Sequence, residues 1–311
     1  MSEKATVASE WLNSCSGCEI AIIDLGERLL DLLELVDFVH IPALMDHKYY
    51  GQLGDGKHKH INIPEAVVGL VSGGIRNEEH MEVAEEMRKK CKIIIGLGTC
   101  ATHGGIPALS NEYTNAETVD YAFSTDTTDE NEFSPGPGIP KLLDRCYALD
   151  EKIKVDIMIP GCPPHPDLIF NALAALLEGK EPQLPKKSNC DCCPTIREGK
   201  GDLKTLRRFL AAPHYKTPDE PLDKMRCFLE QGMLCMGPVT RAGCGGDKID
   251  PRCITARVPC RGCYGPVKPD GNQLLDMLNA LASNDIDIDS LPEYRSLLRF
   301  SGAHNLLKPE V

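Results

Sequence analysis

The sequence predicts an α/β protein in which a doubly wound parallel sheet is followed by a loop-rich domain. In the first half, short apolar runs alternate with helical patterns, which is typical of a parallel sheet covered by helices. From about residue 181 this alternation stops, and nine of the 15 cysteines follow. Because 311 residues suffice for roughly two domains, we expect one at residues 1–180 and a second at residues 181–311.

Five apolar runs are expected to form the strands of the sheet. They are Ala5–Trp11, Val36–His40, Ala66–Val71, Lys92–Leu97 and Val155–Ile159. Helical patterns lie between and after them, at Glu19–Leu35, Asn77–Lys90, Pro140–Leu149 and Asp167–Leu177. The polar, turn-rich segment Gly104–Pro140 is expected to be an inserted loop.

The helix expected at Asn77–Lys90 carries signals at both of its ends. Asn77 can cap the helix, two glutamates follow in the first turn, and three basic residues close the last turn. This order of charges is favourable for the helix dipole.

The second half has no comparable pattern. It is rich in glycine and proline and offers only short helical candidates, Lys204–Ala211 and Asp223–Gln231. Such a segment would bury little apolar surface by itself, whereas metal ligation contributes directly to the free energy of folding. We therefore expect metal cross-links to hold this half together.

Composition excludes several classes of protein. Acidic residues outnumber basic ones by 46 to 34, which argues against a nucleic-acid partner. No export signal is recognisable, and no apolar stretch approaches the roughly 18 residues that span a membrane. In a reducing cytoplasm, 15 cysteines indicate metal binding rather than disulfides.

Four cysteines of the first half follow predicted strands. Cys15 and Cys18 come after the first strand and open a helix, whereas Cys100 and Cys162 each follow a later strand. The carboxyl ends of parallel strands meet at one edge of a sheet, so we expect these thiolates to converge there. Four thiolates suit a 4Fe–4S cluster. Taken alone, Cys15 and Cys18 would fit a redox dithiol or half of a zinc site equally well.

The second half offers eight further candidate ligands, enough for two sets of four. They are Cys190, Cys193, Cys227, Cys235, Cys244, Cys253, Cys260 and Cys263. Spacing alone decides neither which of them share a site nor whether that site holds zinc or an iron–sulfur cluster. Cys192 competes with Cys193, and we favour Cys193 because it completes a CxxC pair. Cys91 and Cys146 are expected to be buried packing residues.

Five motifs resemble those of one known family. They are CSGCE at 15–19, GTCATHGG at 98–105, PGCPP at 160–164, CMGPVT at 235–240 and PCRGC at 259–263. In order and number they are similar to the motifs of nickel–iron hydrogenase small subunits, over nearly the whole chain. The resemblance implies a flavodoxin-like first domain, an iron–sulfur second domain, three 4Fe–4S clusters and a nickel–iron site in a partner large subunit.

The resemblance also implies how the ligands are grouped. The proximal cluster, nearest the nickel–iron site, would be held by Cys15, Cys18, Cys100 and Cys162. The medial cluster would be held by Cys244, Cys253, Cys260 and Cys263. The distal cluster, nearest the electron acceptor, would be held by Cys190, Cys193, Cys227 and Cys235.

Two positions depart from the exported members of the family. Cys190 stands where those members carry a histidine ligand, and Cys253 stands where some carry proline and a 3Fe–4S cluster. Because a thiolate adds negative charge, it lowers the reduction potential of a cluster. We therefore expect three low-potential 4Fe–4S centres that serve a cytoplasmic acceptor.

Within the family the chain is most similar to the methanogen hydrogenase that does not reduce coenzyme F(420). That similarity implies a delta-type 2Fe–2S subunit and a heterodisulfide reductase complex as partners. The expected role is to carry electrons from dihydrogen oxidation at the large subunit, with no catalytic acid or base in this chain. The alternatives are an iron–sulfur carrier subunit of another redox complex and a zinc-stabilised interaction module.

Two polar residues beside the first ligand set have open roles. Glu19 is either a proton relay near the partner subunit or an acid that suits the first turn of its helix. His103, three residues past Cys100, either donates a hydrogen bond to sulfur or packs locally.

Overall fold

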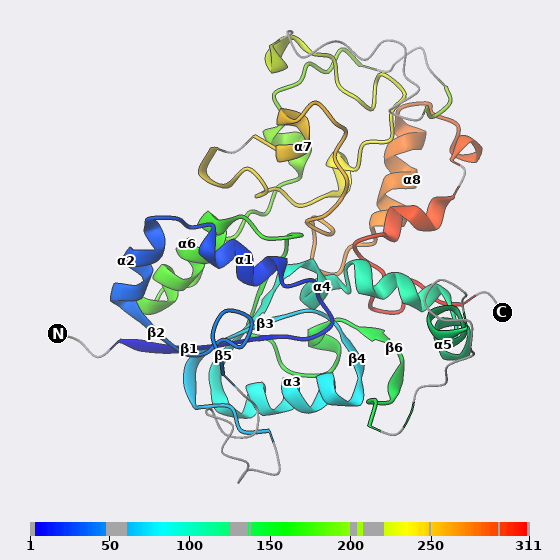
Figure 1. Ribbon diagram of the computed structural model, residues 1–311. Helices are drawn as coiled ribbons and strands as arrows, with labels where there is room; N and C mark the ends of the chain where they lie inside the picture. The colour runs from blue at the N-terminus through cyan, green and yellow to red at the C-terminus, as the bar shows by residue number, and fades with distance from the viewer. Residues whose placement is uncertain are drawn as a thin grey trace. The chain divides into compact units, whose positions relative to one another are not determined.

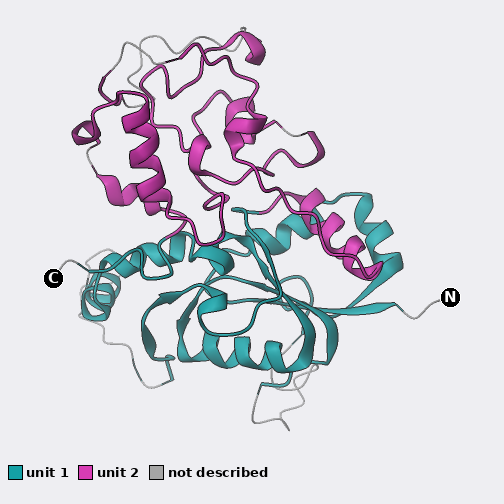
Figure 2. Cartoon of the chain, turned by 180° about the vertical axis from the view of Figure 1, so that it is seen from behind, with its two compact units in different colours: residues 1–163, 302–311 teal, residues 164–301 magenta. Residues whose placement is uncertain are grey.

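The computed structural model describes residues 4–47, 61–124, 136, 138–199, 204–207, 221–248, 250–291 and 293–309. The chain forms two compact units (Figure 2), residues 1–163 with 302–311 and residues 164–301. The division therefore lies after residue 163, against the expected 180, and the last residues belong to the first unit. None of the described helices has the length and apolarity needed to cross a bilayer.

The first unit is built on a five-stranded parallel sheet with the order β2-β1-β3-β5-β7 (Figure 1). The strands are β1 (Ala5–Trp11), β2 (Val36–His40), β3 (Ala66–Ser72), β5 (Cys91–Leu97) and β7 (Ile157–Ile159). Numbered within the sheet, this is the order 2-1-3-4-5 of flavodoxin-like folds. The predicted fold class is confirmed.

Helices cover both sides of this sheet. The helices of the first unit are α1 (Gly17–Ile23), α2 (Arg28–Leu35), α3 (Glu78–Lys90), α4 (Gly98–His103) and α5 (Asn115–Phe123). In Figure 1, α3 lies on one side of the strands, and α1 and α2 lie on the other. Two 3-10 helices, η1 (Ile106–Glu112) and η2 (Leu149–Glu151), and an antiparallel pair, β4 (Ile75–Asn77) and β6 (Leu142–Tyr147), complete the unit.

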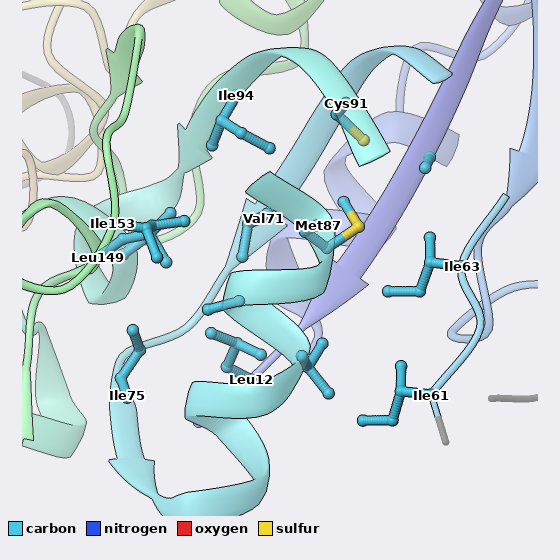
Figure 3. Close-up of a cluster of buried hydrophobic side chains, with 14 of the residues drawn as sticks. Leu12, Ile61, Ile63, Val71, Ile75, Met87, Cys91, Ile94, Leu149 and Ile153 are labelled. Atoms are coloured by element: carbon cyan, nitrogen blue, oxygen red, sulfur yellow. The ribbon is translucent and has the colours of Figure 1, made fainter. Parts of the chain in front are cut away.

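The core of the first unit lies between α3 and the sheet (Figure 3). The Asn77 side chain accepts a hydrogen bond from the His80 N–H at 2.8 Å, and so caps α3 as predicted. Met87 of α3 is fully buried among the same apolar residues as Val71 of β3 and Ile94 of β5. Both strands read as apolar runs because a parallel sheet is buried on its two faces.

The second unit has little regular structure but an apolar core of its own. Its helices are α6 (Pro166–Leu177), α7 (Arg252–Thr255) and α8 (Gln273–Ser283), with short 3-10 helices η3 (Asn189–Cys192), η5 (Leu222–Lys224), η6 (Gly237–Val239), η7 (Gly246–Lys248), η8 (Ile288–Ser290) and η9 (Tyr294–Leu298). Met277 and Leu281 of α8 are buried in one cluster with Phe228 and Met233. The expectation that this half buries little apolar surface by itself is therefore wrong.

Several expectations about local structure are wrong. The single helix expected at Glu19–Leu35 is two helices, because the chain turns at Gly26 with a φ of +62°. Pro140–Leu149 contains strand β6 instead of a helix, because this segment pairs with β4. Gly104–Pro140 includes η1 and α5 and is not simply a loop. Cys91 and Cys146 are buried as expected, but they lie in β5 and β6.

Of the two helices expected in the second half, neither is found as predicted. At Asp223–Gln231 the structure has turns, with only the end of η5 inside the range. Of the other, Lys204–Ala211, residues 204–207 are not helical and residues 208–211 lie outside the described residues.

Candidate iron–sulfur cluster sites

The first set of predicted ligands gathers at the carboxyl edge of the sheet. Cys15 follows β1, Cys18 lies in α1, Cys100 lies in α4 directly after β5, and Cys162 follows β7. Burial raises the pKa of Cys100 to about 12, and the Cys162 and Cys15 thiols add to that rise. Burial, Glu19 and the other three thiols likewise raise the pKa of Cys18. All four sulfurs are thus within electrostatic reach of one another.

Glycines leave room around these sulfurs. A Cβ atom at Gly98 would overlap the Cys18 Sγ, and one at Gly105 would lie 2.7 Å from the Cys100 Sγ. Both glycines have positive φ, +85° and +53°, which L side chains rarely adopt. Only glycine therefore lets the backbone approach the sulfurs at these two positions, and close N–H groups tune the potential of a bound cluster.

Thr99 ties the loop of Cys100 to the loop of Cys162. Its backbone N–H donates to the Gly161 carbonyl at 2.8 Å. In return, the Gly161 N–H donates to the Thr99 Oγ1, also at 2.8 Å. This reciprocal pair fixes the spacing of two ligands that are far apart in the sequence. Sequence reasoning missed Thr99, whose only signal is that it directly precedes Cys100.

Glu19 is buried beside the first set. It lies in the first turn of α1 with 1% of its surface exposed. Among the described residues, no donor makes a well-formed hydrogen bond to its carboxylate oxygens, although Ser72 is close enough to lower the pKa of the carboxyl. Burial raises the pKa of this carboxyl, which favours its neutral form. Its role as a proton relay stays a prediction.

In the second unit, four predicted ligands line one small cavity. They are Cys190, Cys193, Cys227 and Cys235, with Cys260 and apolar residues such as Phe228 completing the lining. Burial, Cys227 and Cys193 raise the pKa of Cys190, which reaches about 12. Cys193 lines this cavity, and Cys192 is not among its lining residues. The geometry therefore favours Cys193 as the ligand.

Three of the remaining four predicted ligands, Cys244, Cys253 and Cys260, interact with one another. Burial raises the pKa of Cys260 to about 11, and the Cys253 and Cys244 thiols contribute to this shift. Cys244 and Cys263 both raise the pKa of the buried Tyr264, so they lie near the same phenol.

Asn189 lines the cavity of Cys190, Cys193, Cys227 and Cys235 and contacts two thiols of the other set. Its Nδ2 donates to the Cys260 Sγ at 3.6 Å, and its Oδ1 accepts from the Cys244 Sγ at 3.7 Å. The Cys260 N–H donates to the Cys235 Sγ at 3.3 Å, which links the two sets directly. Sequence reasoning missed Asn189, which directly precedes Cys190.

These sets fit iron–sulfur clusters in chemistry and in number. Buried thiols with raised pKa values stay protonated unless a cation stabilises the thiolate, and the irons of a cluster supply that positive charge. Twelve thiols in sets of four match the ligand number of three cubane clusters. Among the described residues, no group of three or more His, Cys, Asp or Glu is arranged to hold a single metal ion.

Known proteins are similar to this chain over most of its length. The family described as "NADH ubiquinone oxidoreductase, 20 Kd subunit" matches residues 15–176. One subunit of the F(420)-non-reducing hydrogenase of Methanothermobacter marburgensis is 39% identical over 91% of this chain and 86% of its own. The corresponding vhu subunit of the F(420)-non-reducing hydrogenase of Methanocaldococcus jannaschii is 40% identical over 92% of this chain and 91% of its own.

A solved structure agrees with these relatives. The crystal structure of an NAD+-reducing NiFe-hydrogenase in the H2-reduced state has a TM-score of 0.53 and 31% identity, over 59% of this chain and 96% of that chain. The fold and the sets of buried thiols together define the class of protein, which is a subunit of a redox enzyme. The chain belongs to the family of nickel–iron hydrogenase small subunits, as its motifs predicted, and is thus part of an oxidoreductase.

Proposed function

We propose that this chain carries electrons from dihydrogen oxidation at the nickel–iron site of a large subunit, through three 4Fe–4S clusters, to a cytoplasmic acceptor. One observation carries the proposal: four thiols from three strand ends meet where glycines leave room for a bulky group. A disulfide or a packing role would not need this space. Membership of the hydrogenase family supports the same reading.

The proposed ligand sets follow the motifs of the family. The proximal set is Cys15, Cys18, Cys100 and Cys162, the medial set is Cys244, Cys253, Cys260 and Cys263, and the distal set is Cys190, Cys193, Cys227 and Cys235. When bound, such clusters supply reversible one-electron redox chemistry, with potentials set by charge, hydrogen bonds and exposure.

The residues of this chain would hold and tune these groups. The Thr99–Gly161 pair keeps two proximal ligands in register. The Asn189 amide donates toward a medial sulfur, which stabilises the reduced, more negative state. Glycines exclude side chains from the space between the proximal sulfurs.

Cys190 and Cys253 point to low potentials. Each supplies a thiolate where exported members of the family have histidine or proline, and the added charge disfavours reduction. We infer a low-potential acceptor in the cytoplasm. The proposed partners are a delta-type 2Fe–2S subunit and a heterodisulfide reductase complex, and the names of the two methanogen relatives exclude F(420) as the acceptor of those enzymes.

Metal analysis of the native complex tests the proposal. Purified without oxygen, each chain should contain about twelve irons and about twelve sulfides, and nickel should co-purify in a partner subunit. Dithionite reduction should produce EPR signals of 4Fe–4S centres only. A high-potential 3Fe–4S signal in intact protein would contradict the low-potential reading.

Other results would favour the alternatives. Zinc with little sulfide would indicate a structural module and end the electron-transfer proposal. Full iron and sulfide without any nickel partner would indicate a carrier subunit of another redox complex. About four irons per chain would leave only the proximal cluster.

A further inference from the structure

The C-terminal segment, residues 302–309, packs against the turn that ends α4. The Ala303 N–H donates to the His103 carbonyl at 3.1 Å, and the Ala303 side chain is fully buried. A Cβ atom at Gly104 would lie 2.7 Å from that of Ala303. The Gly104 N–H in turn donates to the Cys100 carbonyl at 3.1 Å. The segment therefore braces the turn directly behind Cys100.

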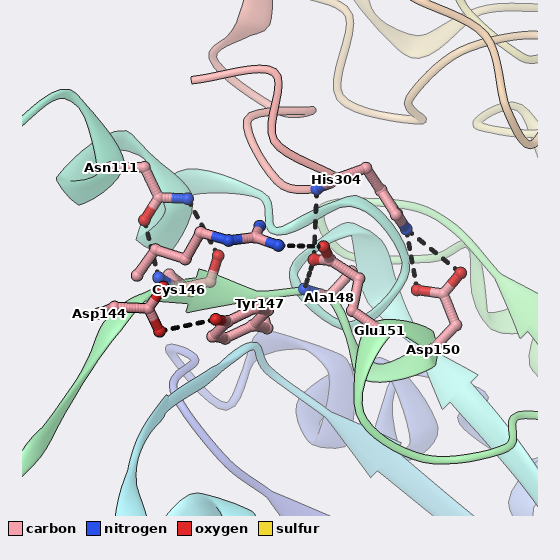
Figure 4. A network of polar contacts seen from close by, with 9 residues as sticks. Asn111, Asp144, Cys146, Tyr147, Ala148, Asp150, Glu151 and His304 are labelled. Atoms are coloured by element: carbon pink, nitrogen blue, oxygen red, sulfur yellow. Dashed lines mark hydrogen bonds and ion pairs between the residues drawn. The ribbon is translucent and has the colours of Figure 1, made fainter. Parts of the chain in front are cut away.

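Polar contacts of His304 hold this segment in place (Figure 4). Its Nε2 lies 2.9 Å from the Asp150 Oδ1, and its backbone N–H donates to the Glu151 Oε2 at 3.2 Å. Glu151 is itself fixed, because it accepts from the Arg145 Nη2 at 2.7 Å and from the Ala148 N–H at 2.9 Å. The anchor of the C-terminal segment is thus the η2 turn that follows β6.

We propose that His304 is a positioning residue for the proximal cluster, because its contacts with Asp150 and Glu151 lock the C-terminal segment against the Cys100 turn. The proposal rests on the proposed function, since it assumes a cluster at Cys100. The lock is expected to weaken as the pH rises, because deprotonation of His304 removes its ionic attraction to Asp150. The proximal cluster would then be more accessible to chelators as the pH rises.

The charged and titratable groups around the His304 ring determine how the lock depends on pH. Asp150 and Glu151 of η2, Arg145 of β6 and His103 of α4 face it. The hydrogen bond to Asp150 raises the pKa of His304 above its usual 6.5, although burial and Arg145 oppose the rise. A raised pKa in the folded state means stabilisation that is complete below about pH 6.5 and is lost as the pH passes through the raised value. Both side chains are about one-third exposed, so solvent weakens the contact.

The test compares rates of cluster loss across pH in the intact complex. Native complex is mixed anaerobically with the Fe(II) chelator bathophenanthroline between about pH 6 and 9, and the proximal EPR signal is followed. In the parent, the rate of loss should rise about fivefold over this range. In H304Q, which cannot carry the charge, the rate should be fast and nearly independent of pH.

Two further variants separate positioning from general damage. H304K keeps a positive charge across the range and should keep the slow rate throughout. D150N should behave like H304Q, whereas the matched control D144N should keep the parental profile, because Asp144 accepts from the Tyr147 hydroxyl and not from the C-terminal segment. Medial and distal signals should decay at the parental rate in every variant.

Two results would overturn this inference and leave the proposed function standing. In the first, the rate of cluster loss in the parent does not change with pH. In the second, the rate in H304Q rises with pH as it does in the parent. A parent that holds no proximal cluster overturns the proposed function and this inference together. The two failures are therefore distinguishable in one experiment.

Discussion

Gly98→Ala is the substitution that most directly tests the space around the proximal sulfurs. Gly98 begins α4 with a φ of +85°, and a Cβ atom there would overlap the Cys18 Sγ. The variant therefore carries two costs. The left-handed backbone costs a non-glycine residue about 1–2 kcal/mol. The overlap adds to this, because a sulfur bound to iron cannot move aside to make room.

Gly26→Ala isolates the first of these costs. Gly26 has a φ of +62°, and nothing lies within 4 Å of the position where its Cβ would be. Its substitution should therefore lower the free energy of unfolding by about 1–2 kcal/mol and leave the clusters intact. Gly17→Ala is the opposite control, since a Cβ atom there lies at an ordinary 3.4 Å from the Cys15 Sγ without a left-handed φ.

The assay is iron and sulfide content after anaerobic purification, with chemical denaturation of each variant. Gly98→Ala should lose about four irons and about four sulfides per chain, together with the proximal EPR signal. Both controls should keep the parental content. Full iron in Gly98→Ala would refute the reasoning about the space, and equal iron loss in Gly26→Ala would show that backbone strain alone explains it.

Three further predictions concern other parts of the chain. Asn77→Ala removes the cap of α3 and should cost about 1 kcal/mol in thermal or chemical unfolding, with no change in iron content. Asn189→Leu removes a donor to the Cys260 Sγ, and a redox titration should show a lower potential for that cluster. A net hydrogen-bond energy of about 0.5–1.5 kcal/mol corresponds to a shift of about 20–65 mV. An equal shift in the exposed control Asn279→Leu would argue against this role of Asn189. Cys193→Ser should lose the distal EPR signal while Cys192→Ser keeps it, and the reverse result would exchange their roles.

The strands of the first unit were predictable because burial on both faces leaves a continuous apolar run in the sequence. β1 and β2 have the predicted bounds, and β3 and β5 each differ from the prediction by one residue. β6 was not predictable in this way, since Leu142–Tyr147 is only partly buried and takes its strand form from pairing with β4. Tertiary pairing of this kind overrides a local helical pattern.

The second unit shows the opposite kind of error. Helix α8 was missed although Asn272 caps it, accepting from the Leu274 and Leu275 N–H groups at 3.0 and 3.2 Å. Its buried Met277 and Leu281 follow helical spacing, so the signal was present in the sequence. α8 is an amphipathic helix that contributes to the apolar core, and it was not predicted because the many cysteines of this half indicated metal ligation instead.

The two ligand-bearing regions also differ in what a sequence can reveal about sites. Parallel strands deliver their carboxyl ends to one edge, so the meeting of Cys15, Cys100 and Cys162 follows from topology once the strands are recognised. No such rule governs the second unit, where turns, 3-10 helices and the short helix α7 carry the thiols. There, contacts such as those of Asn189 with Cys244 and Cys260 depend on the path of every intervening turn. Residues that act through neighbours, such as His304 on the Cys100 turn, are the hardest to predict from sequence. Their partners are about 150 to 200 residues away in the chain. They come into contact only because the C-terminal segment returns to the first unit.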